Sequence, residues 1–313
     1  MVDGNGDRVV GGYVPDLEPG SNGNDRLEVI LRGAIEDLSA SLAAGHQDTI
    51  KLPLVLSVAE PRPGFSAEAA NALGDRLVGS TIGGIQISKV HLRPFGHAAG
   101  LESLGLVAQE VARGKIDAML VAGVDSYFHA DTVDWLESHR QLMNATNRSA
   151  FVPGEGAGVC LVGSSDFARS LSLKAQNCVL GFSRSEEPAI LKSRDVCIGL
   201  GMSEAISMIT QPLNQGERIS AIVSDQNGER YRSDEWGFMA LRHGVHFDDV
   251  TDYLAPAAWW GDMGAASGPL FASLTQFDGA LDPKPRTLLA ASSEGGLRAS
   301  VLLGPLQEQR VAG

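Results

Sequence analysis

Hydrophobic and polar positions follow two different spacings along this chain. Apolar residues that recur three and four positions apart predict helices, whereas short apolar runs bounded by turn residues predict buried strands. The helical spacing occurs over residues 26–44, 66–77, 101–113, 135–143, 201–209, 233–241 and 269–277. The strand pattern occurs over residues 52–58, 85–92, 116–122, 173–182, 219–224, 287–292 and 297–303, and a glycine-rich hinge leads into a further strand within 151–163. Ser66 precedes the second helix, and we expect it to cap that helix.

The alternation of strands with helices predicts an α/β protein with mostly parallel sheets. The continuous apolar run at 116–122 is typical of a central strand that is covered on both faces. Two successive parts of the chain show a similar alternation of predicted strands and helices, but they share no sequence period. This favours a fold that is built from two similar halves.

Composition and charge disfavour several classes of function and location. The chain has 313 residues, of which 43% are hydrophobic and 20% charged, so it can bury a large core. A formal net charge of −13 disfavours broad electrostatic binding to nucleic acid or to an anionic membrane. No apolar run reaches about 18 residues, so we expect no helix across a membrane. The first residues, MVDGNGDRVV, do not resemble a secretory signal, and the odd number of cysteines favours a reducing cytoplasm.

One stretch, residues 95–162, combines a small-residue turn that opens a helix with two glycine-rich motifs. The first motif, G-x-x-D-x-x-x-x-G-G-x-(D/E), is matched by Gly114, Asp117, Gly123 and Asp125, with Ala122 in place of one glycine. The second, G-F-x-x-G-E-G-A-G, is matched over 151–158. In this combination the chain resembles the β-ketoacyl synthase branch of the thiolase superfamily. Weaker matches follow in the family's order at 222–228, 261–268 and 292–303.

The resemblance implies an α/β, thiolase-like five-layered α-β-α-β-α fold made of two similar halves. Residues 1–165 would form the amino-terminal half, which is short at its start, and residues 166–313 the carboxyl-terminal half. The resemblance also implies a dimer joined at edge strands. It further implies a pocket for an acyl thioester of acyl carrier protein or coenzyme A, without a cofactor or a metal. The substrate-binding positions would be Phe151, Trp260, Gly295 and Gly296.

The catalytic positions of the family carry different residues in this chain. His97 stands at the nucleophilic cysteine, Asp225 and Asp262 stand at the two histidines, and Ala257 stands at the lysine. None of the three cysteines aligns with the nucleophile. The normal reaction needs a thiolate that accepts the acyl group and two imidazoles that stabilise an enolate. Because two carboxylates oppose that negative charge, we expect no ordinary Claisen condensation.

Each of these side chains also has a structural interpretation. The positive end of the helix after His97 is expected to lower its pKa. The neutral imidazole could then act as a base or a transient acyl carrier, or it could simply bond a backbone carbonyl. Asp225 lies in a turn sequence, and Asp262 precedes a helix that it could cap. Trp259 and Trp260 could be core residues or could narrow the pocket.

Three functions remain open from the sequence. The first is a non-condensing protein of fatty acid or polyketide metabolism that binds an acyl chain or carrier, as a homodimer or as the partner of an active synthase. The second is an atypical acyltransferase or thioester hydrolase that uses His97 with Asp225 and Asp262, since a histidine beside a carboxylate is a workable base. The third is a metal site made of one histidine and two carboxylates. Convergence of the three side chains beside an open pocket would favour chemistry, and separation would favour a scaffold.

Overall fold

The computed structural model describes residues 10–15, 17, 23–42, 49–144, 146–173, 175, 177–191, 193–276 and 285–306. The helices are α1 (Gly23–Leu42), α2 (Ala67–Leu77), α3 (Ala99–Ala112), α4 (Ala130–Ser138), α5 (Ser165–Ser170), α6 (Leu200–Thr210), α7 (Arg230–His243), α8 (Ala257–Trp260) and α9 (Ser267–Leu274). The strands are β1 (Ile50–Ser57), β2 (Thr81–Ile82), β3 (Ile85–Arg93), β4 (Ala118–Ser126), β5 (Glu155–Gly163), β6 (Asn177–Glu186), β7 (Ala221–Ser224), β8 (Thr287–Ser292) and β9 (Leu297–Pro305). Short 3-10 turns occur at Gly96–Ala98, Gly244–His246 and Gly264–Ala266.

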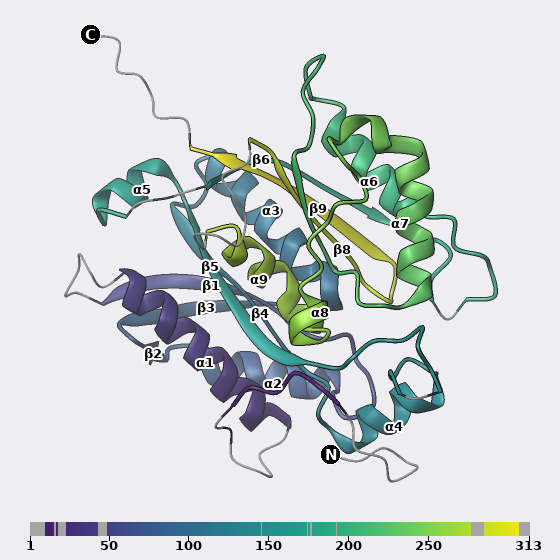
Figure 1. The fold of residues 1–313 in the computed structure, drawn as a ribbon. Coiled ribbons are helices and arrows are strands. Elements are labelled where there is room, and N and C mark those ends of the chain that lie inside the picture. The colour runs from purple at the N-terminus through teal and green to yellow at the C-terminus, as the bar shows by residue number, and fades with distance from the viewer. Residues whose placement is uncertain are drawn as a thin grey trace.

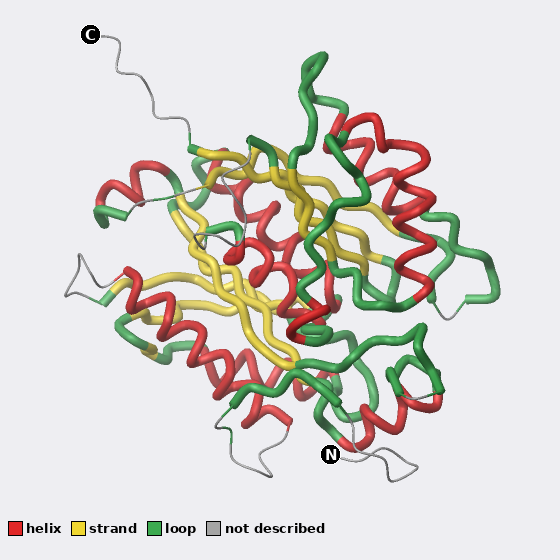
Figure 2. Tube along the Cα trace, in the orientation of Figure 1, coloured by secondary structure: helices red, strands yellow, loops and turns green. Residues whose placement is uncertain are grey.

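These elements form five layers, in which helices alternate with two sheets (Figures 1 and 2). α1 and α2 cover the outer face of a five-stranded sheet with the order β2-β3-β1-β4-β5. α6 and α7 cover the outer face of a four-stranded sheet with the order β6-β9-β8-β7. α3 and α9 lie between the sheets and contact both. The structure therefore has the α-β-α-β-α layers and the two similar halves that the sequence predicts, while the boundary between residues 165 and 166 stays a prediction.

The expectation of mostly parallel sheets is wrong, because each sheet is mixed. β1 runs parallel to β3 and β4, and β7 runs parallel to β8. The pairs β2–β3, β4–β5, β6–β9 and β8–β9 are antiparallel. The last strand of each half reverses direction, β9 after a tight turn and β5 after an excursion through α4. β4 is nevertheless central, as the apolar run at 116–122 predicts.

Most predicted elements occur within a few residues of their expected positions. Ser66 caps α2 as expected, because its side chain accepts a hydrogen bond from Ala69 N. The helix predicted at 135–143 is misplaced: α4 begins after His129, whose ring nitrogen accepts from Asp131 N. It ends before Arg140, which has a φ of +57°. A left-handed residue cannot continue a right-handed helix, so the apolar pattern beyond this point is not helical.

The core is divided by the sheets. Neighbouring residues of β1 point to opposite faces, so Leu54 packs towards α1 and α2, whereas Val55 packs between the two sheets. A third apolar cluster joins α6 and α7 to the second sheet through residues such as Met239 and Leu288. Because both sheets are buried on both faces, the polar groups at their strand ends lie deep in the protein.

The two inner helices begin next to each other. Each is preceded by one 3-10 turn, Gly96–Ala98 before α3 and Gly264–Ala266 before α9. A Cβ atom on Gly100 would lie 2.4 Å from Pro269 Cδ, and one on Gly268 would lie 2.6 Å from Leu101 N. Glycine is therefore needed at both positions for this close approach. The close approach of α3 and α9 brings the turn that carries His97 next to the turn that follows Asp262.

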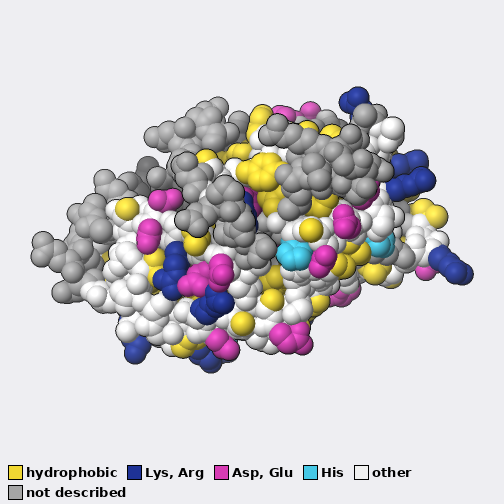
Figure 3. All heavy atoms as spheres, turned by 90° about the horizontal axis from the view of Figure 1, so that it is seen from below, with side chains coloured by type: hydrophobic (Ala, Val, Ile, Leu, Met, Phe, Trp, Pro, Cys, Tyr) yellow, Lys and Arg dark blue, Asp and Glu magenta, His cyan; other side chains and the backbone are white. Residues whose placement is uncertain are grey.

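The surface seen in Figure 3 carries acidic and basic side chains that lie close to one another. Exposed ion pairs of the protein include Arg113 with Glu110 and Arg230 with Asp234. Within the described ranges, no helix is both long enough and apolar enough to cross a membrane.

Candidate functional site

His97 lies on the turn that connects β3 to α3. Gly96 precedes it with a φ of +66°, a left-handed conformation that lets the strand turn directly into the helix. Ala98 N donates a hydrogen bond to Ser293 Oγ at 2.9 Å, which ties this turn to the loop between β8 and β9. The imidazole is held inside the protein, and only 6% of His97 is exposed.

Asp262 is the direct partner of His97. The distance between His97 Nε2 and Asp262 Oδ1 is 2.8 Å. The same oxygen accepts hydrogen bonds from Gly264 N at 2.7 Å and from the Tyr127 hydroxyl at 3.1 Å. The other oxygen accepts from Asn227 Nδ2 at 2.5 Å. The expectation that Asp262 caps the helix is wrong, because the cap position of α9 is Ala266 and that of the preceding turn is Met263. Asp262 instead accepts a hydrogen bond from Gly264 N and fixes the orientation of the imidazole.

Attraction between His97 and Asp262 outweighs the cost of burying them. Burial acts against protonation of His97, but the Asp262 carboxylate more than offsets it, so the pKa of His97 is raised. Burial alone would raise the pKa of Asp262, but His97, Arg232 and Asn227 hold that pKa well below its usual range. The expectation that the helix lowers the pKa of His97 is wrong, because a carboxylate at hydrogen-bond distance has a larger effect than the partial charge of a helix end.

Asp225 does not join this pair. Its Oδ2 atom accepts a hydrogen bond from Arg232 Nη1 at 2.5 Å and one from Ser292 N at 2.7 Å. Arg232 Nε also donates to Glu229 Oε2 at 3.1 Å, so one buried guanidinium serves two buried carboxylates. Burial alone would lower the pKa of Arg232, but Asp225 and Glu229 raise it well above its usual value. Asp225 therefore bonds Arg232 rather than His97 or Asp262, and the three residues are not among the groups of described residues that could hold a metal ion. A joint catalytic role of the three stays a prediction.

The space beside the pair is small. A hollow of about 260 Å³, partly open to solvent, is lined by Asp225, Trp260 and Asp262 together with half-buried apolar residues such as Met263 and Leu270. His97 does not line it. This hollow offers no enclosed channel for a long acyl chain.

The other expected substrate-binding residues lie in different environments. Phe151 is 2% exposed and packs against Tyr127, with 5.2 Å between the ring centroids. Gly295 and Gly296 lie in the turn between β8 and β9, where Gly295 N donates to Glu60 Oε1 at 3.0 Å. The assignment of these three residues to substrate binding stays a prediction.

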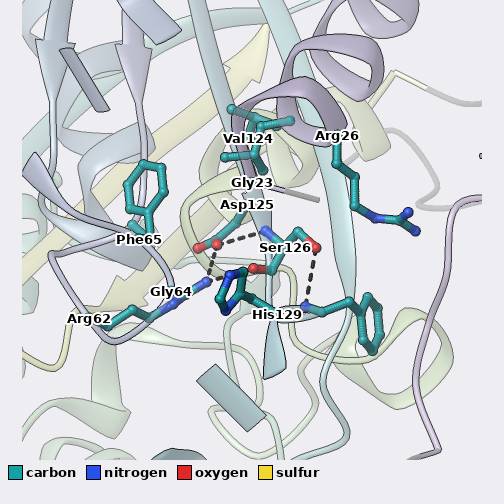
Figure 4. A pocket seen from close by; sticks show the side chains of 12 residues that line it. Gly23, Arg26, Arg62, Gly64, Phe65, Val124, Asp125, Ser126 and His129 are labelled. Carbon is teal, nitrogen blue, oxygen red and sulfur yellow. Dashed lines mark hydrogen bonds and ion pairs between the residues drawn. The ribbon is translucent and has the colours of Figure 1, made fainter. Parts of the chain in front are cut away.

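A second hollow, of about 360 Å³, is lined by residues that include Arg26, Arg62 and Asp125 (Figure 4). Arg62 reaches into it, and its Nη2 atom donates to Asp125 Oδ1 at 2.6 Å. The guanidinium of Arg62 also lies over the ring of Tyr127, 4.3 Å from its centroid, while the Tyr127 hydroxyl bonds Asp262. A continuous polar chain therefore joins the two hollows through Tyr127.

The cysteines do not supply a substitute nucleophile. Burial raises the pKa of Cys160 to about 11, so its thiol is protonated at neutral pH. Cys178 lies on β6 and Cys197 lies before α6, and burial raises the pKa of both. Among the described residues, one group could in principle hold a metal ion: Glu187, Cys197 and Glu235. Its carboxylates already accept hydrogen bonds from backbone amides and from Ser292 and Arg298.

Three residues of this site are not predicted from the sequence. Arg232 neutralises Asp225, while Tyr127 and Asn227 bond Asp262. A signal for Arg232 does exist, because Glu229 and Arg232 are three positions apart at the start of a helix, a spacing that brings side chains together. Tyr127 follows the expected strand at 116–122 and carries no comparable signal.

Comparison with known proteins identifies the fold. No family model matches the chain, and no curated protein matches it. A β-ketoacyl synthase from Burkholderia phymatum is similar in structure, with a TM-score of 0.67 and 15% identity over 95% of this chain and 88% of that one. The chain has the β-ketoacyl synthase fold. This confirms the fold that the resemblance of residues 85–305 implies.

Two further structures with this synthase fold are informative. The ishigamide ketosynthase/chain length factor has a TM-score of 0.67 and 15% identity, and the match covers 94% of this chain and 87% of that one. A type II polyketide synthase acyl-carrier protein in complex with its ketosynthase has a TM-score of 0.66 and 13% identity, with coverages of 94% and 88%. At such low identity the shared property is the fold.

Proposed function

We propose that this protein is a non-condensing member of the synthase-fold proteins, acting in fatty acid or polyketide metabolism as an acyl-binding or partner subunit. The observation that carries the proposal is the ion pair between His97 and Asp262, whose side-chain atoms lie 2.8 Å apart; the resemblance assigns the position of the nucleophile to His97. A side chain in a buried ion pair mainly stabilises the structure around it, because a reaction that broke the pair would leave a buried charge uncompensated.

The chemistry of the pair supports this function. An imidazolium has no lone pair with which to attack a thioester, and the raised pKa of His97 favours that form. The carboxylates of Asp225 and Asp262 replace the hydrogen-bond donors that stabilise an enolate in the family, and an anion there would raise the energy of the enolate. Asp225 is tied to Arg232 and cannot turn towards a substrate without breaking this buried ion pair.

The same comparison supports a proposal for the partner of this subunit. Solved structures with this fold include a ketosynthase/chain length factor and a ketosynthase in complex with an acyl-carrier protein. By analogy, the chain would bind an acyl thioester of acyl carrier protein or coenzyme A, and it would assemble as a homodimer or with an active synthase. An intact fold without reactive groups is what such a role requires.

A direct assay tests this proposal. The protein is mixed with malonyl and acyl thioesters of acyl carrier protein, and carbon dioxide and β-ketoacyl product are measured against a protein-free blank. We expect neither above the blank, and no difference between the wild type and His97→Ala. Condensation that His97→Ala abolishes would contradict the proposal.

A second function, thioester hydrolysis or acyl transfer, is favoured by one feature of the pair. Asp262 orients the imidazole through Nε2, while Nδ1 of His97 has no hydrogen-bond partner among the described residues. A neutral His97 would therefore present a lone pair on Nδ1. The same assay separates this function, because thiol release would occur without condensation. His97→Asn would stop that release, and the control His139→Asn, at an exposed position, would leave it unchanged.

A further inference from the structure

The hollow of about 260 Å³ beside Asp225 and Asp262 has walls from α8, from α9 and from the segment that joins them. Figure 1 shows α8 beside α9 in the middle of the molecule. The apolar side chains that line the hollow are Pro256, Ala257, Trp260, Met263, Leu270 and Phe271. Most of them are only half-buried, so the walls retain uncovered apolar surface. A ligand with an apolar body gains free energy by covering that surface.

The hollow also contains a hydroxyl group without a partner. Ser267, the first residue of α9, lines the hollow and is 4% exposed. Its Oγ atom forms no hydrogen bond to any residue in the described part of the chain, yet it is not sealed from water. Buried polar groups of native proteins nearly always have a partner. This hydroxyl is therefore available to a ligand in the hollow.

A carboxylate oxygen is available in the same hollow. Asp225 is 5% exposed, and its Oδ2 atom is engaged by Arg232 Nη1 at 2.5 Å and by Ser292 N at 2.7 Å. Among the described residues none bonds its Oδ1 atom, which is likewise not sealed from water. A carboxylate oxygen can only accept hydrogen bonds, so a ligand that meets Oδ1 must donate one.

The charges beside the hollow favour a cationic donor. Arg232 pairs with both Asp225 and Glu229, so one positive and two negative groups leave this cluster with a net charge of −1. His97 and Asp262 balance each other in their own ion pair. An ammonium would neutralise the remaining charge, and hydrogen bonds between ionised groups are stronger than those between neutral ones.

The positive end of α9 does not reverse this preference. In the turn before the helix, Gly264 N donates to Asp262 Oδ1 at 2.7 Å, and Ala265 N donates to Asp125 Oδ2 at 2.9 Å. The end of a helix carries a partial charge of about half an elementary charge. Because two carboxylates already face this end, it adds little repulsion for a cation in the hollow.

We infer that this hollow binds a small molecule with a primary ammonium group and a short apolar body. The ammonium would donate to Asp225 Oδ1 and Ser267 Oγ, and the apolar body would lie against Trp260 and Leu270. Apolar walls with a few polar groups that fix the orientation are typical of small-molecule sites. The inference goes beyond the proposed function, and its test contains no thioester, so each can fail without the other.

Binding of three related probes to the full chain tests the preference for an ammonium. Isothermal titration calorimetry at neutral pH compares hexylamine, hexan-1-ol and hexanoate, which share an apolar body and differ in the head group. We expect hexylamine to bind about tenfold more tightly than hexanol or better, because its head group is charged. Hexanoate should not bind. Equal binding of hexylamine and hexanol, or no binding of hexylamine, would refute the inference.

A matched pair of variants tests where the amine binds. Ala257 lines the hollow, whereas its neighbour Ala258 is exposed. Ala257→Phe fills the hollow and should weaken hexylamine binding by about tenfold or more. Ala258→Phe adds the same side chain outside the hollow and should bind like the wild type. Equal binding by the two variants would show that the amine binds elsewhere and would overturn the inference.

Two further substitutions test the polar contacts. Ser267→Ala removes one acceptor and should weaken hexylamine binding by about threefold to tenfold. Asp225→Asn replaces the charged acceptor with an amide and should abolish the preference for hexylamine over hexanol. Urea unfolding shows whether each variant is folded, and Ser267→Ala, which keeps the Asp225–Arg232 pair, remains decisive if Asp225→Asn is not. Unchanged hexylamine binding by Ser267→Ala would contradict the inferred contacts and refute the site.

Discussion

Replacing Arg232 with methionine is expected to lower the free energy of unfolding by about 3–5 kcal/mol. Methionine retains much of the length of the side chain but removes the charge. Asp225 and Glu229, which are 5% and 4% exposed, would then be left without the cation that both contact. An uncompensated buried charge is among the most destabilising features that a single substitution creates. Urea unfolding followed by circular dichroism measures the difference.

Arg230→Met is the matched control for this substitution. Arg230 lies on the same helix, α7, but its side chain is 82% exposed, and within the described ranges it pairs with Asp234 alone, at the surface. We expect a change of less than about 1 kcal/mol for this variant. Equal effects of the two substitutions would mean that Arg232 does not neutralise Asp225, and the interpretation of Asp225 as a structural residue would fail.

The stability that the His97–Asp262 pair contributes is expected to be greatest between about pH 4 and pH 6.5. The pKa of His97 is raised on folding, so its contribution is complete below its unfolded value of 6.5 and is lost as the pH rises through the folded value. The pKa of Asp262 is lowered, so its contribution is complete above the unfolded value of 3.8 and is lost as the pH falls through the folded value. Each unit of pKa difference corresponds to about 1.4 kcal/mol.

Two variants separate the two sides of this profile. For His97→Gln, the free energy of unfolding should no longer fall at alkaline pH. For Asp262→Asn, it should no longer fall at either acidic or alkaline pH, and it should be about 3 kcal/mol lower than that of the wild type at pH 6. His139→Gln, at an exposed position, should keep the profile of the wild type. The measurement is the urea unfolding free energy between pH 3 and pH 9. Parallel profiles for the wild type and Asp262→Asn would show that the two groups are not ionised together.

Much of the fold could be predicted from local sequence. The spacing of Leu27, Ile30 and Leu31 predicts α1, because it indicates a helix with one buried face. The continuous apolar run in 52–58 predicts β1, because it indicates a strand that is buried on both faces. The glycine-containing turn at 293–296 predicts a hairpin of the strands at 287–292 and 297–303, and the antiparallel pairing of β8 and β9 confirms it. The direction of β5 could not be predicted, since the pattern of a buried strand is the same in parallel and antiparallel pairs. α4 was misplaced because its end depends on the left-handed Arg140, a backbone property that hydrophobic spacing does not contain.

The candidate site could be predicted only in part. The resemblance places His97 and Asp262 together, although 165 residues separate them, and the structure brings them to 2.8 Å. It also places Asp225 with them, and Asp225 does line the same hollow as Asp262, but its carboxylate pairs with Arg232. Charged residues near a helix start are usually exposed, so nothing in the sequence alone marks Arg232 as a buried partner. The protonation of His97 depends on the distance between its imidazole and the Asp262 carboxylate. Composition and residue spacing do not give that distance.

The intact mass of the protein after exposure to an acyl thioester is the most direct test of whether the synthase fold has lost its nucleophile. The full chain is incubated with an acyl thioester of coenzyme A, quenched in acid and measured by mass spectrometry, with an active β-ketoacyl synthase as the positive control. We expect the positive control to gain one acyl group and this protein to keep its unmodified mass. A stoichiometric acyl adduct that peptide mapping assigns to His97 or to a cysteine would contradict the non-condensing function.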